Sequence, residues 1–191
     1  STQMAGGLET LRKRGFIYQL TDEDILRKNL DTPTTVYAGF DPTSDSLHLG
    51  HLLPVMAMRW LQEAGHRAIV LVGGGTGLVG DPSGKSEQRP ILSREEIDNN
   101  ARGIKNQLQQ FLDFGPDKGL LLNNADWLGK LNYIDFLRDI GKHININRML
   151  NAESIRTRLE TGMSFLEFNY SVLQAYDFYL LNRDYDCTVQ I

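Results

Sequence analysis

Two histidines stand three positions apart in the segment SLHLGHLLPVMAMRW (46–60). Side chains three residues apart share a helix face, so His48 and His51 could together bind a metal, transfer protons or hold an anion. Alternatively, they could have a purely structural role as hydrogen-bonded side chains at the start of a helix. A zinc helix motif needs histidines four apart and an adjacent glutamate, which disfavours a metal. The anion alternative is favoured by Gly50, which leaves room for a flat ligand, by the free N–H groups of a helix start, and by Pro54, which suits a first turn.

A glycine-rich loop, GGGTGLVGDPSGK (73–85), follows an apolar stretch and formally matches the GxGxxG dinucleotide fingerprint. That fingerprint should open a helix, whereas Asp81 and the Pro-Ser-Gly that follows it interrupt the segment. A phosphate-binding P-loop also fails, because Val79 stands where its first glycine is required. Asp81 is therefore either a ligand for a cationic group or an ordinary turn aspartate.

A third candidate lies in the stretch MSFLEFNYSVLQAYDFYLL (163–181). Helical spacing places Tyr170, Gln174 and Asp177 on one face, at i, i+4 and i+7. A polar stripe in an otherwise apolar and aromatic helix is costly unless its members find partners. The spacing therefore predicts one wall of a polar pocket.

The elements that would position these residues alternate between strand and helix. Apolar, β-rich runs predict strands at 34–40, 67–72, 119–124 and 185–191. Helical periodicity and capping boxes, at Thr21 with Asp24 and at Ser93 with Glu96, predict helices at 8–15, 22–30, 50–64 and 93–114 and a mostly helical segment at 131–181. This order predicts an α/β fold with a parallel sheet and helices on both faces, in which ligands bind beyond the carboxyl ends of the strands.

Composition limits the function classes. The chain has 191 residues, of which 41% are hydrophobic, so it is long enough for one well-buried domain. A net charge of −4 gives no broad basic surface, so any contact with a nucleic acid must be local. Cys187 is the only cysteine, and no stretch has the apolar length of a membrane helix or signal peptide. We expect a soluble, intracellular protein.

Three stretches together closely resemble the tyrosyl-tRNA synthetases of the bacterial and organellar type: YAGFDPTSDSLHLGH (37–51), GGGTGLVGDPSGK (73–85) and FLEFNYSVLQAYDF (165–178). The likeness runs in order from about Leu8 to the last residue. HLGH matches the first signature of class I synthetases, which use this helix start to hold ATP. The resemblance implies a Rossmann-like catalytic domain that activates L-tyrosine with ATP, releases pyrophosphate and passes the tyrosyl group to tRNA.

The resemblance also implies site residues. Tyr37 and Asp177 match the pair that hydrogen-bonds the phenol of tyrosine. The residues matching those around its α-amino group are Asp81, Tyr170, Gln174 and Gln190. The residues matching ATP contacts are Gly39, Asp41, Gly50 and His51 for the adenosine, and Thr43 and His48 for the departing phosphates. Thr43, His48 and His51 are the catalytic candidates, because a carboxylate attacks the α-phosphate without a general base and the enzyme supplies alignment and donors.

The same family implies tRNA(Tyr) as partner, a homodimer formed through residues 125–160, and no membrane partner. Mg²⁺ is expected on the ATP phosphates, without a dedicated protein metal site. The cytoplasm is the expected location, with the mitochondrial matrix or a plastid as alternatives. The second signature loop and the C-terminal tRNA-binding domains of the family are absent from residues 1–191, so we expect an incomplete catalytic domain that is not fully active alone.

Three alternatives remain open. The sister tryptophanyl enzymes share the reaction, although Tyr37 together with Asp177 favours a phenol over an indole. A synthetase-derived RNA-binding protein, such as an organellar splicing cofactor, would use the fold as a platform. An NAD-dependent oxidoreductase would rest on the GxGxxG match alone.

Overall fold

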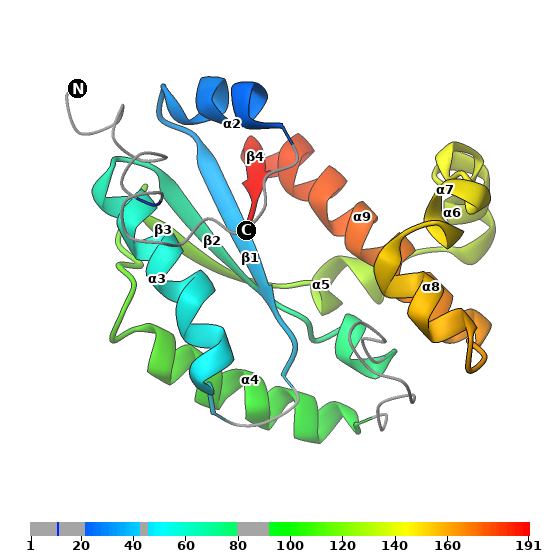
Figure 1. Ribbon diagram of the computed structural model, residues 1–191. Helices are drawn as coiled ribbons and strands as arrows, with labels where there is room; N and C mark the ends of the chain where they lie inside the picture. The colour runs from blue at the N-terminus through cyan, green and yellow to red at the C-terminus, as the bar shows by residue number, and fades with distance from the viewer. Residues whose placement is uncertain (1–10, 12–21, 43–45, 80–91) are drawn as a thin grey trace.

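The computed structural model describes residue 11 and residues 22–42, 46–79 and 92–191. Within these residues, four parallel strands form one sheet in the order β3-β2-β1-β4 (Figure 1). The strands are β1 (Thr35–Phe40), β2 (Arg67–Val72), β3 (Gly119–Asn123) and β4 (Cys187–Gln190). The predicted parallel sheet is confirmed, and each of the four predicted strands is present.

The register of the sheet brings three strand ends to one edge. Phe40 of β1 is the partner of Val72 in β2, and Val72 is the partner of Asn123 in β3. The loops that follow these residues therefore leave the sheet side by side. On the other side of β1, a register shift between Thr35 and Val36 is followed by pairing of Gln190 with Tyr37.

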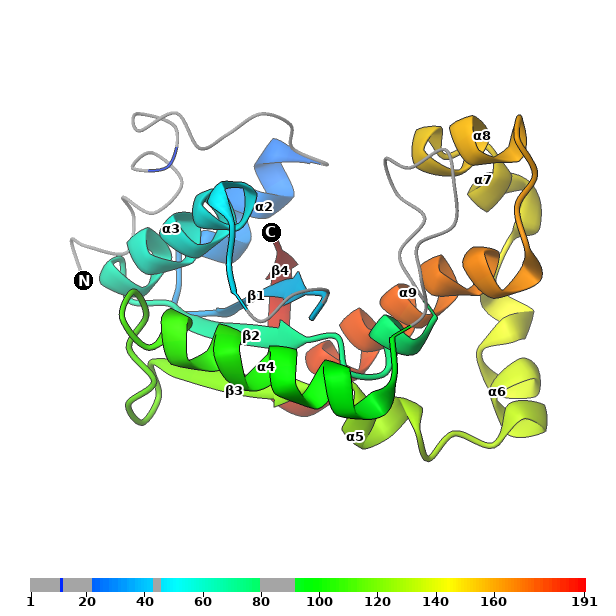
Figure 2. The same ribbon diagram turned by 90° about the horizontal axis from the view of Figure 1, so that it is seen from below.

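Helices cover both faces of the sheet, as predicted. Because alternate residues of a strand point to opposite faces, Val36 and Phe40 pack in the cluster that includes Met58 of α3 (Leu49–Glu63) and Ile104 of α4 (Arg94–Leu108). Tyr37 belongs to the opposite cluster, with residues of α9 (Phe165–Tyr185) and α5 (Ala125–Leu128). Figure 2 shows α3 and α9 on opposite sides of β2, with α4 in front of β2 and β3.

Of the remaining helices, α2 (Glu23–Leu30) contributes Leu30 to the cluster that includes Met58. The others are α6 (Tyr133–Asp139), α7 (Ile146–Leu150) and α8 (Glu153–Leu159), with 3₁₀ turns at Thr76–Leu78 and Gly141–His143. Figures 1 and 2 both show α6, α7 and α8 gathered beside the sheet, next to the beginning of α9. This group confirms the mostly helical segment predicted for 131–181. None of the helices in the described ranges has the length and apolar character needed to cross a membrane.

Capping residues decide where the helices begin. The capping box of Ser93 and Glu96 is confirmed at the start of α4. Of the box predicted for Thr21 and Asp24, Thr21 lies outside the described residues; α2 is capped by Asp22, whose carboxylate accepts the N–H of Ile25 at 3.1 Å. Pro54 lies inside α3 and not in its first turn. The helix predicted for 8–15 falls outside the described residues, apart from Leu11.

Candidate active site

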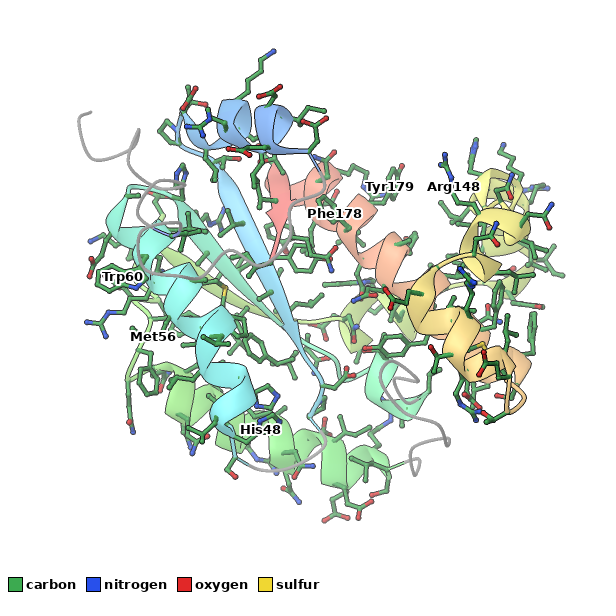
Figure 3. The ribbon with its side chains drawn as sticks, in the orientation of Figure 1. His48, Met56, Trp60, Arg148, Phe178 and Tyr179 are labelled. Carbon is green, nitrogen blue, oxygen red and sulfur yellow. The ribbon has the colours of Figure 1, made fainter. Side chains whose placement is uncertain are left out.

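A cavity of about 690 Å³ opens at the carboxyl edge of the sheet, a volume within the range of small-molecule sites. It lies between the start of α3 and the inner face of α9. In Figure 3, His48 lies at the lower end of α3 on one side of β1, and Phe178 lies on α9 on the other side. The sequence-predicted residues that line the cavity are Tyr37, Gly39, Asp41, His48, His51, Tyr170, Gln174, Asp177 and Gln190.

Three predicted residues do not appear among the lining residues. Gly50 lies beside the His48 ring, and a Cβ there would come within 2.7 Å of His48 Cε1, so the position has no room for a side chain unless the ring moves. Thr43 and Asp81 lie outside the described residues. At Gly39, in contrast, an added Cβ would meet nothing within 4 Å, so the absence of a side chain leaves this wall open to a ligand.

One end of the cavity presents a buried phenol and a buried carboxylate. Tyr37 is 2% exposed, and its hydroxyl has no hydrogen-bond partner in the described part of the chain. Its ring packs edge-on against Phe178, with centroids 5.4 Å apart. Asp177 accepts hydrogen bonds from Trp127 Nε1 at 2.7 Å and from Asn124 Nδ2 at 2.9 Å. An unsatisfied buried hydroxyl is costly, so this end is suited to a ligand that brings a polar group.

Burial controls the protonation of this pair. It raises the pKa of Asp177 to about 6, against the lowering effect of the hydrogen bonds from Asn124 and Trp127, and the charge of Asp41 raises it further. Burial also raises the pKa of Tyr37 well above its ordinary value, with a smaller contribution from the charge of Asp177. Tyr37 is therefore a hydroxyl donor at neutral pH, while Asp177 is mostly a carboxylate.

A second network joins three loops at the sheet edge. The hydroxyl of Tyr170 donates to Asp41 Oδ2 at 2.8 Å, and the hydroxyl of Thr76 donates to Asp41 Oδ1 at 3.4 Å. Asn124 Nδ2 donates to the Thr76 hydroxyl at 3.1 Å, and Asn124 Oδ1 accepts the N–H of Gly75 at 2.8 Å. The network therefore holds the loops after β1, β2 and β3 against α9.

The two histidines begin α3 in a reciprocal cap. Nδ1 of His48 accepts the N–H of Gly50 at 3.0 Å, and Nδ1 of His51 accepts the N–H of His48 at 3.2 Å. The rings stack with centroids 3.8 Å apart. Burial, followed by the charge of His48, lowers the pKa of His51. A neutral imidazole that accepts at Nδ1 carries its proton on Nε2. The two histidines can therefore cap α3 through Nδ1 and also donate to an anion through Nε2.

Comparison with known proteins identifies the family. Residues 28–191 match the family described as tRNA synthetases class I (W and Y). The chain belongs to this family. The tyrosine–tRNA ligase of Fusobacterium nucleatum is 54% identical over 190 residues, which cover 99% of this chain and 47% of that protein. That of Caldanaerobacter subterraneus is 55% identical over 185 residues, which cover 96% of this chain and 46% of that protein.

The fold agrees with this class I synthetase assignment. A truncated mitochondrial tyrosyl-tRNA synthetase of Aspergillus nidulans superposes with a TM-score of 0.85 at 31% identity, covering 98% of this chain and 59% of that chain. The Rossmann-like sheet that the resemblance implied is thereby confirmed. The synthetase chain spans about half the length of the curated relatives it matches.

Sequence reasoning missed three residues that hydrogen-bond to the side chains lining the cavity: Thr76, Asn124 and Trp127. Asn124 directly follows β3 at the edge where ligands bind in parallel sheets, so the same rule that singled out the other loops could have identified it. Trp127 and Thr76 gave no local signal, because their partners are about fifty residues away in the sequence. Among the described residues, no group of three or more His, Cys, Asp or Glu side chains is placed to hold a metal ion.

Proposed function

We propose that this chain forms the substrate pocket of a tyrosine–tRNA ligase, which activates L-tyrosine with ATP to tyrosyl-adenylate and pyrophosphate and then transfers tyrosine to tRNA(Tyr). The observation that carries the proposal is the buried, unpartnered hydroxyl of Tyr37 at the Asp177 end of the cavity. A bound phenol would accept from Tyr37 and donate to Asp177, so that both buried groups gain a partner.

The rest of the cavity suits the other parts of the substrates. Tyr170, Gln174 and Gln190 supply hydroxyl and amide oxygens for an ammonium group, and we assign Asp81 to the same subsite from the sequence. Gly39, Asp41, Gly50 and His51 are assigned to the adenosine. This order places the amino group between the phenol end and the start of α3.

We assign Thr43 and His48 to the departing phosphates. The carboxylate of tyrosine attacks the α-phosphate and negative charge grows on the leaving pyrophosphate. Because Nδ1 of His48 accepts the N–H of Gly50, its Nε2–H is the donor left for this charge. Mg²⁺ would be held mainly by the ATP phosphates, where it supplies further positive charge.

The alternatives are less well supported. A tryptophan substrate would bring an indole N–H donor and no acceptor for the Tyr37 hydroxyl, and the curated relatives named above are tyrosine–tRNA ligases. A dinucleotide site is disfavoured because β2 is followed by the short 3₁₀ turn Thr76–Leu78 and not by an α-helix. A protein that used this fold only to bind RNA would not need the buried Tyr37 hydroxyl, which has no hydrogen-bond partner among the described residues.

We further propose that the active protein is a homodimer. The face formed by α6, α7, α8 and the first turn of α9 exposes large apolar side chains: Tyr133, Ile134, Leu137, Ile146, Leu159, Phe165 and Leu166. Such a patch is typical of a subunit interface. This apolar face overlaps residues 125–160, for which the resemblance to the family implied the dimer contact.

Location and domain content are also proposals. The cytoplasm is favoured by the bacterial relatives, with the mitochondrial matrix and plastid as alternatives. Since the chain spans about half of those relatives, we propose that it is the first part of the catalytic domain, with the second signature loop and the tRNA-binding domains elsewhere in such a protein.

The deciding experiment is ATP–pyrophosphate exchange by the full-length protein with tyrosine, tryptophan or no amino acid. Exchange that depends on tyrosine alone is the expected result. Exchange with tryptophan would make the protein a tryptophanyl enzyme. Absence of exchange, together with binding of RNA or NAD, would favour one of the other two alternatives.

A further inference from the structure

A buried ion pair lies outside the cavity, between Arg158 of α8 and Glu167 of α9. The two side chains are 8% and 2% exposed. Arg158 Nη2 donates to Glu167 Oε1 at 3.1 Å, and Arg158 Nε lies 2.8 Å from Oε2, close enough for an ion pair although not aligned for a hydrogen bond. Arg158 Nη1 also donates to the Thr161 hydroxyl at 2.7 Å and to the carbonyl of Gly162. One guanidinium thus joins the end of α8, the connecting loop and the start of α9.

The start of α9 does not itself require this pair. Ser164 caps the helix by accepting the N–H of Glu167 at 3.1 Å, the same Ser-x-x-Glu spacing that begins α4. In α4, Glu96 completes the box by accepting the N–H of Ser93 at 2.8 Å. Glu167 occupies the equivalent position, but its carboxylate accepts from the Ser164 hydroxyl at 3.4 Å and from Arg158 Nη2 at 3.1 Å, and not from the backbone N–H of the cap as Glu96 does. Because burying two charges is costly, this departure indicates a role in addition to capping.

The position of Glu167 connects the ion pair to the substrate pocket. Glu167, Tyr170, Gln174 and Asp177 follow one face of α9 at i, i+3, i+7 and i+10. Glu167 therefore extends the polar stripe of the pocket wall by one turn toward α8. Tyr170, on the next turn, donates to Asp41 at 2.8 Å. Rotation or displacement of the first turns of α9 would move the Tyr170 hydroxyl before it moved Asp177.

We propose that Arg158 and Glu167 are positioning residues for tyrosine: they fix the first turn of α9 so that Tyr170 presents its hydroxyl to the substrate's amino group. The inference rests on the proposed function. It makes tyrosine affinity depend on two residues that do not touch the cavity. ATP affinity depends on them little, because Asp41 is also held from the side of Thr76.

A double-mutant cycle on the full-length protein tests this role. The single variants are Arg158→Lys, which keeps the positive charge but loses the planar guanidinium donors, Glu167→Gln and Tyr170→Phe. The double variants combine Tyr170→Phe with Arg158→Lys or with Glu167→Gln. L-tyrosine binding is measured by calorimetry, and KM for ATP and kcat by pyrophosphate exchange. Arg156→Lys is the matched control, since Arg156 lies on α8 but is exposed.

We expect Arg158→Lys and Glu167→Gln to weaken tyrosine binding about tenfold, with kcat and KM for ATP nearly unchanged. In the Tyr170→Phe background the same changes should weaken binding less than about twofold, because the hydroxyl they position is gone. The control should bind as the wild type does. If Arg158 and Glu167 served only packing, their variants would instead weaken the binding of both tyrosine and ATP. Their effect on tyrosine binding would then be the same with and without Tyr170→Phe.

Additive effects, or equal losses for tyrosine and ATP, would overturn the inference. If one single variant does not fold, as judged by circular dichroism, the other completes the cycle alone. If neither folds, the pair is a requirement of the fold and the inference is wrong. A wild-type protein without tyrosine binding and without exchange would overturn the proposed function as well, whereas normal wild-type values with an additive cycle would overturn this inference alone.

Discussion

Tyr170 on α9 donates a 2.8 Å hydrogen bond to Asp41 after β1, across 129 residues of sequence. We assign Tyr170 to the amino group of tyrosine and Asp41 to the adenosine of ATP. The proposed tyrosine and ATP subsites therefore adjoin at a single carboxylate, whose second oxygen accepts from Thr76. In the proposed complex, the carboxylate of tyrosine would lie toward the α-phosphate of ATP, the arrangement that adenylate formation requires.

Selectivity against phenylalanine should depend on Tyr37. In the wild type, phenylalanine would leave the buried Tyr37 hydroxyl without a partner, which typically costs about 1–3 kcal/mol. Tyr37→Phe removes that penalty, so the ratio of kcat/KM for tyrosine to that for phenylalanine should fall by about tenfold or more. Tyr185→Phe, on the same helix-covered face of the sheet but not among the lining residues of the cavity, is the control. An unchanged ratio in Tyr37→Phe would place the phenol elsewhere.

Tyrosine affinity should decrease in acid as Asp177 takes up a proton. Burial raises the pKa of this carboxyl to about 6, so the carboxylate that accepts the phenol proton is lost as the pH falls below that value. Trp127→Phe removes a 2.7 Å donor that lowers this pKa, so the acid-side loss of affinity should begin at a higher pH. Binding curves from pH 5 to 8 measure the shift.

The matched control is the chain's other tryptophan. Trp60→Phe changes a residue of α3 that packs against the opposite face of the sheet. It should leave the pH dependence of tyrosine binding as in the wild type. Identical profiles for Trp127→Phe and the wild type would mean that Asp177 does not control binding.

His48 should have two separable roles. Asparagine is a good N-cap, so His48→Asn should keep α3 stable while removing the Nε2 donor, and activation should slow by the equivalent of about 3 kcal/mol. His48→Ala should slow activation as much and also lower the free energy of unfolding by about 1 kcal/mol. Single-turnover pyrophosphate release and urea denaturation measure the two effects. Normal activation in His48→Asn would reduce the role of this residue to capping.

Dimer formation should depend on the apolar face of α6. Ile134 is 65% exposed there, and a charge at this position would remain buried and unpaired in the proposed interface. Ile134→Asp should therefore shift the full-length protein toward monomer in sedimentation velocity experiments. Ile25→Asp, at a 60% exposed position on α2, should not. Equal behaviour of both variants would exclude this face.

Stability in mild acid should depend on His66. This side chain is 2% exposed, and its Nδ1 accepts the N–H of Thr34 at 3.2 Å. Burial lowers its pKa below 6.5, so the unfolded chain takes up a proton first as the pH falls. The stabilising contribution is present above about pH 6.5 and is lost below it. His66→Gln should flatten the decrease in unfolding free energy between pH 7 and 5.5, and an unchanged slope would contradict this account.

Much of the fold followed from local patterns in the sequence. Apolar runs and the box of Ser93 and Glu96 act within a few residues, so they predicted β1, β2, β3 and the start of α4. The start of α2 was predicted one residue early, because Thr21 and Asp22 are both good caps and spacing alone does not choose between them. Pro54 was placed in a first turn because local rules disfavour proline inside a helix.

The site was less accessible to such rules. Tyr170, Gln174 and Asp177 were found because a polar stripe at helical spacing is itself a local signal. Asn124 links Thr76 with Asp177, and the hydrogen bonds that give it this role span 48 and 53 residues. Packing, and not spacing, brings such partners together. Arg158 and Glu167 are only nine residues apart, but they lie on two different helices, so no spacing within one helix indicated the pair.

The edge position of β4 has a consequence for synthesis of the protein. Thr188 at this edge meets Thr34 at 2.6 Å, across 154 residues, and Gln190 pairs with Tyr37 in the sheet. On a ribosome, the outer edge of β1 therefore stays without its neighbour until almost all of these residues have been made. Parallel pairing over such separations is slow to form and leaves a strand edge open to other chains. Because Gln190 and Ile191 line the cavity, the proposed tyrosine pocket is complete only after β4 has docked, and a ligand that bound there would stabilise the assembled sheet.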